Sequence, residues 1–131
     1  MPFARLTVIP APAPELAHRL ATDLKTLIAR ELRKQHDLTS VLIETPGRYD
    51  WAIGAVRTET AAHLEVCVTA GTNSEDEKRA FIETAMLVLR QALPGLAEAT
   101  YIVVKELPAV DWGYDGLTQA FRAAQRIPKP I

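Results

Sequence analysis

The sequence predicts an α/β domain in which two β-α-β units form one four-stranded mixed sheet with both helices on one face. Strand-like and helix-like segments follow one another in the order strand, helix, strand, and this order occurs twice. A short motif after the second strand also returns after the fourth. We therefore interpret residues 1–131 as a single domain built of two halves, at about 2–57 and 62–120.

The first half begins with alternating apolar residues over 3–9, which predict a strand. Pro14 suits the first turn of a helix, and apolar residues then recur at three- to four-residue spacing over 16–32. The continuous apolar run within residues 38–45 predicts an inner strand that is packed on both faces.

The second half has the same order. Residues 63–69 alternate and predict a third strand. Thr72-Asn73-Ser74 offers helix caps, and the acidic residues 75–77 favour a helix amino terminus. This helix is expected to stop at Pro94-Gly95, and residues 100–106 supply a fourth strand.

An internal sequence repeat indicates that the two halves have the same fold. Residues 44–54 and 106–116 both contain Glu, any residue, Pro, a short gap, Asp-Trp, a second gap and Gly. The two halves keep a separation of about sixty residues throughout. Each half is therefore expected to be a right-handed unit with parallel strands, joined edge to edge with the other.

The sheet face without helices is expected to be mildly polar. It would carry Arg5, Thr7, Glu65, Cys67 and Thr69. This set is too mixed for a fully solvated surface, so we expect a partner subunit to cover it. The alternative is a sheet face that is open to water.

Charge and composition exclude several classes of partner. Fifteen Lys and Arg residues stand against sixteen Asp and Glu residues, with no block of like charge, so nucleic acid is not expected. No apolar stretch approaches the length that spans a bilayer, and no membrane partner is expected. The single cysteine, Cys67, cannot form an internal disulfide. These features predict a cytoplasmic protein.

The usual catalytic motifs are absent from the sequence. It has no Cys-x-x-Cys, His-x-x-x-His or His-Glu-x-x-His pattern, so no metal site is expected. It also lacks a phosphate-binding glycine loop and a Gly-x-Ser-x-Gly elbow.

Pro2 is the remaining candidate for chemistry. Removal of Met1, which is usual before a small residue, would leave a secondary amine at the start of the chain. Burial or nearby cations disfavour the charged form of an amine, so this nitrogen could accept a proton near neutral pH. The ring also fixes the direction of the nitrogen at the start of a strand.

These features together resemble the 4-oxalocrotonate tautomerase superfamily over nearly the whole chain. The resemblance is carried by Pro2 before a strand, the doubled strand-helix-strand plan, Leu38-Thr39-Ser40-Val41 and Trp51-Ala52-Ile53-Gly54. Gly71-Thr72-Asn73 and residues 112–119 look like segments of fused bacterial members.

The resemblance implies a tautomerase fold like that of macrophage migration inhibitory factor. It implies a homotrimer, whose centre would cover the polar sheet face, and an activity that needs no metal or organic cofactor. Pro2 would be the general base that moves a proton between carbon and oxygen of a keto-enol, 2-oxo acid-like substrate. One alternative is a decarboxylase or dehalogenase-type relative, since residues 111–112 are similar to the malonate semialdehyde decarboxylase branch. Another is a non-catalytic trimeric binding or structural protein.

The substrate-binding residues of the family carry over only in part. Trp51 stands at the place of an aromatic pocket-wall residue, or it packs within a hairpin. The arginines that hold substrate carboxylates are missing, because Pro12 and Leu42 occupy their places. Residues 71–73 do not offer the arginines of the decarboxylase and dehalogenase branches either.

Other residues are then needed to bind an anionic substrate. Arg48, Arg57 and Lys105 flank the strand ends and are candidates, with solvated surface charge as the alternative. Trp112 and Tyr114 are candidates for lining the same pocket within a subunit or across a subunit boundary, with an oligomer contact as the alternative.

Overall fold

The computed structural model describes residues 2–126, so the predicted removal of Met1 concerns a residue outside the described ones. Four strands form the main sheet in the order β2-β1-β5-β6. Their bounds are β1 (Phe3–Ile9), β2 (Ser40–Glu44), β5 (Ala61–Thr69) and β6 (Tyr101–Leu107). β1 is parallel to β2, β5 is parallel to β6, and the central strands β1 and β5 are antiparallel. The predicted mixed sheet of two β-α-β units is confirmed.

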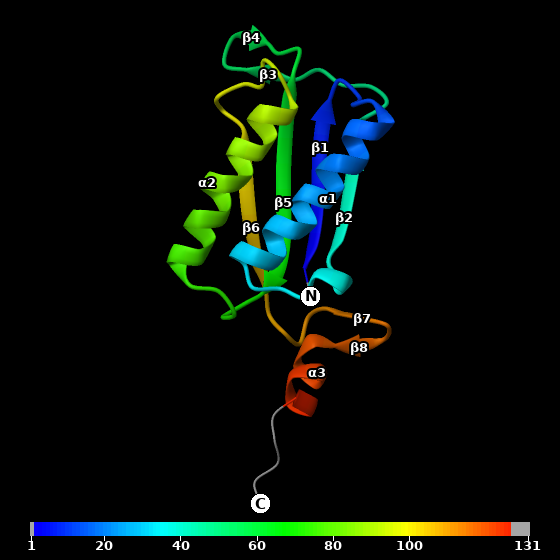
Figure 1. Cartoon of the computed structure of the whole chain (residues 1–131), viewed down its shortest axis with the longest axis vertical. Helices are drawn as coiled ribbons and strands as arrows, with labels where there is room; N and C mark the ends of the chain where they lie inside the picture. Colours follow the sequence, from blue (N-terminus) through cyan, green and yellow to red (C-terminus); the bar gives the residue numbers. More distant parts are fainter. Residues whose placement is uncertain (1, 127–131) are drawn as a thin grey trace, which may run out of the picture.

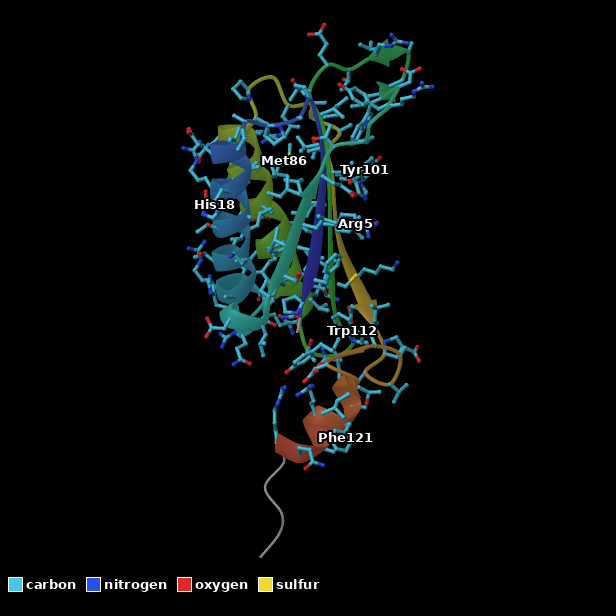
Figure 2. All side chains as sticks on the ribbon, turned by 90° about the vertical axis from the view of Figure 1, so that its right-hand side faces the viewer. Arg5, His18, Met86, Tyr101, Trp112 and Phe121 are labelled. Atoms are coloured by element: carbon cyan, nitrogen blue, oxygen red, sulfur yellow. The ribbon has the colours of Figure 1, made fainter. Side chains whose placement is uncertain are left out.

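The two long helices cover one face of this sheet, as predicted. They are α1 (Pro14–Glu31) and α2 (Glu75–Ala92), and Figure 1 shows them side by side over the strands. Figure 2 shows the sheet nearly edge-on, with Arg5 and Tyr101 on the side away from the helices. Alternate strand residues such as Leu6 and Leu64 are fully buried beneath the helices. Burying such a side chain contributes roughly 1.5–3 kcal/mol, so this layer supplies most of the stability.

Helix α2 begins with the predicted cap. The Ser74 backbone N–H donates to Glu77 Oε1 (2.8 Å), and the Glu77 N–H donates to Ser74 Oγ (3.1 Å). This reciprocal capping box satisfies two amide groups that the helix itself leaves unpaired. Helix α1 begins at Pro14, again as predicted.

The prediction for β2 is wrong in one respect. β2 is an edge strand rather than an inner strand packed on both faces. Val41 and Ile43 pack against the core, but the side chain between them, Leu42, is 40% exposed. A short apolar run is compatible with either position, and the strand order decides between them.

Two small hairpins extend beyond the main sheet and correspond to the sequence repeat. They consist of β3 (Ala52–Ile53) with β4 (Val56–Arg57), and of β7 (Gly113–Tyr114) with β8 (Leu117–Thr118). In the first, Thr58 N–H donates to the Trp51 carbonyl, and in the second Gln119 N–H donates to the Trp112 carbonyl, both at 2.9 Å. The repeated motif therefore folds twice into the same local structure.

The hairpins lie at opposite ends of the sheet (Figure 1). The β3–β4 hairpin follows β2, whereas the β7–β8 hairpin follows β6 and lies at the end where β1 begins. Two short helices were not predicted, η1 (His36–Leu38) before β2 and α3 (Gln119–Arg126) after β8. None of the described helices is long and apolar enough to cross a membrane.

Candidate functional site

Pro2 is buried directly before the central strand β1. Its carbonyl oxygen accepts a hydrogen bond from Ser40 N–H at 3.2 Å. The next residue, Phe3, is paired with Ser40 of β2 on one side and with Cys67 of β5 on the other. One hydrogen bond therefore holds the backbone of Pro2 on the β2 side, and the residue after it is held on both sides, which helps to direct the ring nitrogen.

A cavity of about 300 Å³ lies at this end of the sheet. The loop after α1 lines it with Arg33, Lys34 and Gln35. The last residue of β5, Thr69, and Thr72 in the turn after β5 form a second wall. Thr69 is two residues beyond the partner of Phe3 in β5, so this wall comes from a strand that flanks the start of β1. Pro2 itself is not among the described residues that line the cavity.

The third wall of the cavity comes from α3. Gln119, Ala123 and Arg126 line the cavity and are spaced four and three residues apart, which places them on one face of the helix. With Arg33 and Lys34, three cations and no carboxylate occur among the described lining residues. We refer to it as the basic cavity. Carboxylates outside its lining offset part of this charge, because Glu77 is paired with Arg33, and both Glu77 and Glu106 act on Lys34.

Lys34 is the most constrained of these cations. Its Nζ donates to Thr72 Oγ1 at 2.7 Å. Burial lowers the pKa of Lys34, and the nearby carboxylates of Glu77 and Glu106 oppose this shift only partly. Desolvation destabilises the charged form of Lys34 more than the neighbouring carboxylates stabilise it. An anion bound beside the ammonium group would therefore stabilise that charged form.

Ion pairs hold the loops around the cavity together. Arg33 Nε lies 3.0 Å from Glu77 Oε2, and Lys78 bonds to Glu106. The hydrogen bond from Lys78 lowers the pKa of Glu106, and the Gly71 N–H, which donates to Glu106 Oε2 at 3.1 Å, adds to this effect. The turn after β5 is thereby tied to the end of β6.

Arg33 occupies an unfavourable backbone conformation at the cavity. It follows the last turn of α1 with a φ of +53°, in the left-handed region that usually holds glycine. A residue with a Cβ atom loses roughly 1 kcal/mol there. The chain therefore keeps a guanidinium group at the cavity rim at a cost in stability.

Three of the predicted site residues share an end of the sheet with Pro2. Lys105 is paired with Cys67, the partner of Phe3, and lines a separate cavity of about 270 Å³ on the open sheet face. Trp112 lies just before the β7–β8 hairpin and Tyr114 lies within it. Both are at this end of the sheet, as Figure 2 shows for Trp112.

The aromatic residues of this hairpin have a structural contact of their own. The guanidinium carbon of Arg122 lies 3.8 Å from the centroid of the Tyr114 ring, and Arg122 Nη2 donates to the Tyr114 carbonyl at 3.1 Å. Trp112 Nε1 is buried and has no hydrogen-bond partner among the described residues. Neither aromatic residue is among the described residues that line the basic cavity.

The other three predicted residues lie at the opposite end. Trp51 precedes the β3–β4 hairpin, Arg48 lies in the loop before it, and Arg57 forms an ion pair with Asp50 at 3.1 Å. Figure 1 shows this hairpin at the end of the sheet away from the start of β1. Within one chain they are separated from Pro2 by the length of the sheet. They can contribute to a site with Pro2 only if it belongs to another copy.

Sequence reasoning missed the residues that line the basic cavity. Lys34, Gln119 and Arg126 were not candidates, although they come from segments that meet at the amino end of β1. Among the described residues there is also no group of three or more His, Cys, Asp or Glu side chains that could hold a metal ion.

Comparisons with known proteins match the fold only. No protein-family model and no curated protein matches the chain. A solved structure of a fused 4-OT, a symmetric trimer, is 16% identical with a TM-score of 0.78, covering 95% of this chain and 99% of that chain. A macrophage migration inhibitory factor homologue from Prochlorococcus marinus is 22% identical with a TM-score of 0.74, covering 88% and 97%. The protein Pt0534, inactivated by 2-oxo-3-pentynoate, is 12% identical with a TM-score of 0.79, covering 92% and 98%.

Proposed function

We propose that this chain, which has the fold of the tautomerase superfamily, is a cofactor-independent tautomerase acting on the enol or keto form of a 2-oxo acid. The observation that carries the proposal is the position of Pro2. It is buried at the start of a central strand, at the same end of the sheet as a cavity with three cations and no carboxylate among its described lining residues.

The proposed reaction transfers one proton. The Pro2 nitrogen removes the enol O–H proton, the electron pair shifts through the conjugated system, and the same proton is returned at the neighbouring carbon to give the ketone. Lys34 and the arginines beside it hold the carboxylate and stabilise the negative charge that develops on the enolate. Burial of Pro2 also disfavours a protonated ring nitrogen, which would keep the base available near neutral pH.

The proposed substrate class has independent support. An anionic ligand fits the three cations that line the cavity, and a 2-oxo acid has one carboxylate beside its carbonyl group. The structurally similar protein Pt0534 is inactivated by a compound of this class, 2-oxo-3-pentynoate. We therefore favour a 2-oxo acid over a neutral ketone.

The proposal requires that Met1 be removed, because an acylated ring nitrogen is an amide and cannot act as a base. We expect protein with a free Pro2 to convert phenylenolpyruvate to phenylpyruvate, which is followed by ultraviolet absorbance. Intact-mass spectrometry identifies the processed form. The matched control is the same chain with Met1 retained, for which turnover is expected at the uncatalysed rate. Equal turnover by both forms would contradict the role of Pro2, and the absence of turnover by the processed form would favour a binding protein.

We also propose that the chain forms a homotrimer through the open sheet face. Phe3, Arg5 and Lys105 lie around a cavity on this face, and Tyr101 at its edge is 70% exposed. The fused 4-OT of similar fold is a symmetric trimer. We expect light scattering at micromolar concentration to give three times the chain mass of 14.4 kDa. A species of 14.4 kDa would refute this assembly.

A further inference from the structure

We infer that the side-chain amide of Gln119 is a specificity-determining contact, which donates a hydrogen bond to the carboxylate of the ligand in the basic cavity. The inference deepens the proposed function and rests on it for the identity of the ligand. Its physical basis is the burial of Gln119, the internal repeat and the chemistry of the cavity wall.

Gln119 is a buried polar residue that lines a cavity. It is only 7% exposed, and it is one of two buried polar residues among the described part of the chain. The other, Thr39, bonds through its hydroxyl group to the Gln35 carbonyl at 2.8 Å. The side-chain amide of Gln119, in contrast, has no hydrogen bond with the described residues. Gln119 lines the cavity and is not among the described residues with fully buried, unpartnered polar atoms, so its amide is available to a ligand in the cavity. A ligand group that accepts a hydrogen bond from this amide would be held favourably there.

The internal repeat shows that the hairpin does not require this amide. Thr58 occupies the equivalent position in the first half and makes the same backbone hydrogen bond to Trp51 that Gln119 makes to Trp112, also at 2.9 Å. The shared bond uses the backbone N–H alone. A different side chain therefore serves the same turn at the other end of the sheet, and the glutamine amide is additional to what the fold needs.

The surroundings of Gln119 favour an anionic ligand. Arg126 lies seven residues further along the same face of α3, and Lys34 lies in the wall formed by the loop after α1. An amide can accept a hydrogen bond from a cation through its oxygen and donate through its NH₂ group at the same time. Ala123, between Gln119 and Arg126 on this face, is small and leaves space for the ligand.

The test compares two variants of Gln119 with a control on the same helix. Gln119→Leu removes the amide at similar size, and Gln119→Thr introduces the residue of the first repeat. Gln125→Leu is the control, because Gln125 is exposed and is not among the described residues that line the cavity. Calorimetry measures binding of 3-phenylpropanoate, an inert carboxylate, and of its neutral amide, and thermal unfolding is measured in parallel.

We expect both Gln119 variants to bind 3-phenylpropanoate about tenfold or more weakly than the unaltered chain, because a hydrogen bond to a charged group is lost. Binding of the neutral amide should change little, Gln125→Leu should bind like the unaltered chain, and the unfolding midpoint of Gln119→Leu should stay the same or rise. With phenylenolpyruvate, the variants should raise KM more than they lower kcat.

Unchanged carboxylate affinity in both variants, or no binding by the unaltered chain, would overturn the inference. A lowered unfolding midpoint with unchanged affinity would show that Gln119 has a structural role only. Because 3-phenylpropanoate is not turned over, these results stand apart from the proposed reaction. Absence of phenylenolpyruvate turnover by an unaltered chain that still binds 3-phenylpropanoate would count against the base at Pro2 and not against Gln119.

Discussion

Pro2→Ala is expected to lower kcat/KM for phenylenolpyruvate by about 10²- to 10⁴-fold, the usual contribution of a positioned general base. The variant keeps a terminal amine once Met1 is removed, but the amine is no longer held by a ring whose φ is fixed. The expected loss therefore measures the direction of the nitrogen lone pair as well as its basicity. Stopped-flow or steady-state absorbance gives kcat and KM separately, and the larger loss should be in kcat.

The control for this substitution is Pro94→Ala. Pro94 is exposed and lies two residues after the last residue of α2, Ala92. This end of α2 lies away from the start of β1 (Figure 1), so the substitution should leave kcat/KM unchanged. For the unaltered chain, kcat/KM should rise with pH as the ring nitrogen loses its proton and then level off. Full turnover by the Pro2→Ala variant would exclude Pro2 as the base. A kcat/KM of the unaltered chain that falls as the pH rises would exclude it as well.

Lys34→Met is expected to weaken binding of the 2-oxo acid while leaving the fold at least as stable. A hydrogen bond between charged groups contributes about 1.5–3 kcal/mol, which corresponds to roughly 10- to 150-fold in kcat/KM. Burial lowers the pKa of Lys34, so the charged ammonium group opposes folding, and an apolar side chain of similar length removes that cost. Kinetics and denaturant unfolding measure the two effects.

The sign of the pH effect follows from the lowered pKa of Lys34. Between the folded pKa and the unfolded value of 10.5, the unfolded chain binds more protons, so stability should rise with pH in that window and Lys34→Met should abolish this part of the rise. Lys25→Met is the control, since Lys25 is a half-buried lysine of α1 that is not among the described lining residues. Equal losses of kcat/KM in Lys34→Met and Lys25→Met would show that the loss comes from removing one positive charge from the chain, and not from a contact in the cavity.

Most of the fold could be predicted because local pattern and topology agree in this chain. The alternating segments correspond to β1 and β5, and the helical stripe after Pro14 corresponds to α1. The repeat then predicted that β1 is parallel to β2 and β5 is parallel to β6, because each half is a strand-helix-strand unit with a right-handed crossover. The edge position of β2 and the existence of α3 could not be predicted in this way. Both depend on which segments meet in space, and local periodicity does not report that.

The basic cavity could have been inferred from the same topology. In a parallel β-α-β unit, the loop that leaves the helix returns to the amino ends of both strands. Arg33 and Lys34 lie in such a loop, and it must therefore end near Pro2. The segment with Arg48 and Trp51 follows β2 and must lie at the carboxyl ends, away from Pro2. The resemblance to a family motif pointed to Arg48 and Trp51 as site residues. The connectivity of the β-α-β unit points instead to the loop with Arg33 and Lys34.

The two β-α-β halves lie in one continuous chain, and this limits the number of reactive ring nitrogens in any assembly. Ala62 stands sixty positions after Pro2, and its neighbour across the strands is Val8. Its nitrogen is part of a peptide bond, so the second half of the duplicated scaffold can never present a secondary amine. However many copies associate, the number of reactive ring nitrogens cannot exceed the number of chains. Under the proposed function, the second half of each chain therefore carries no base of this kind.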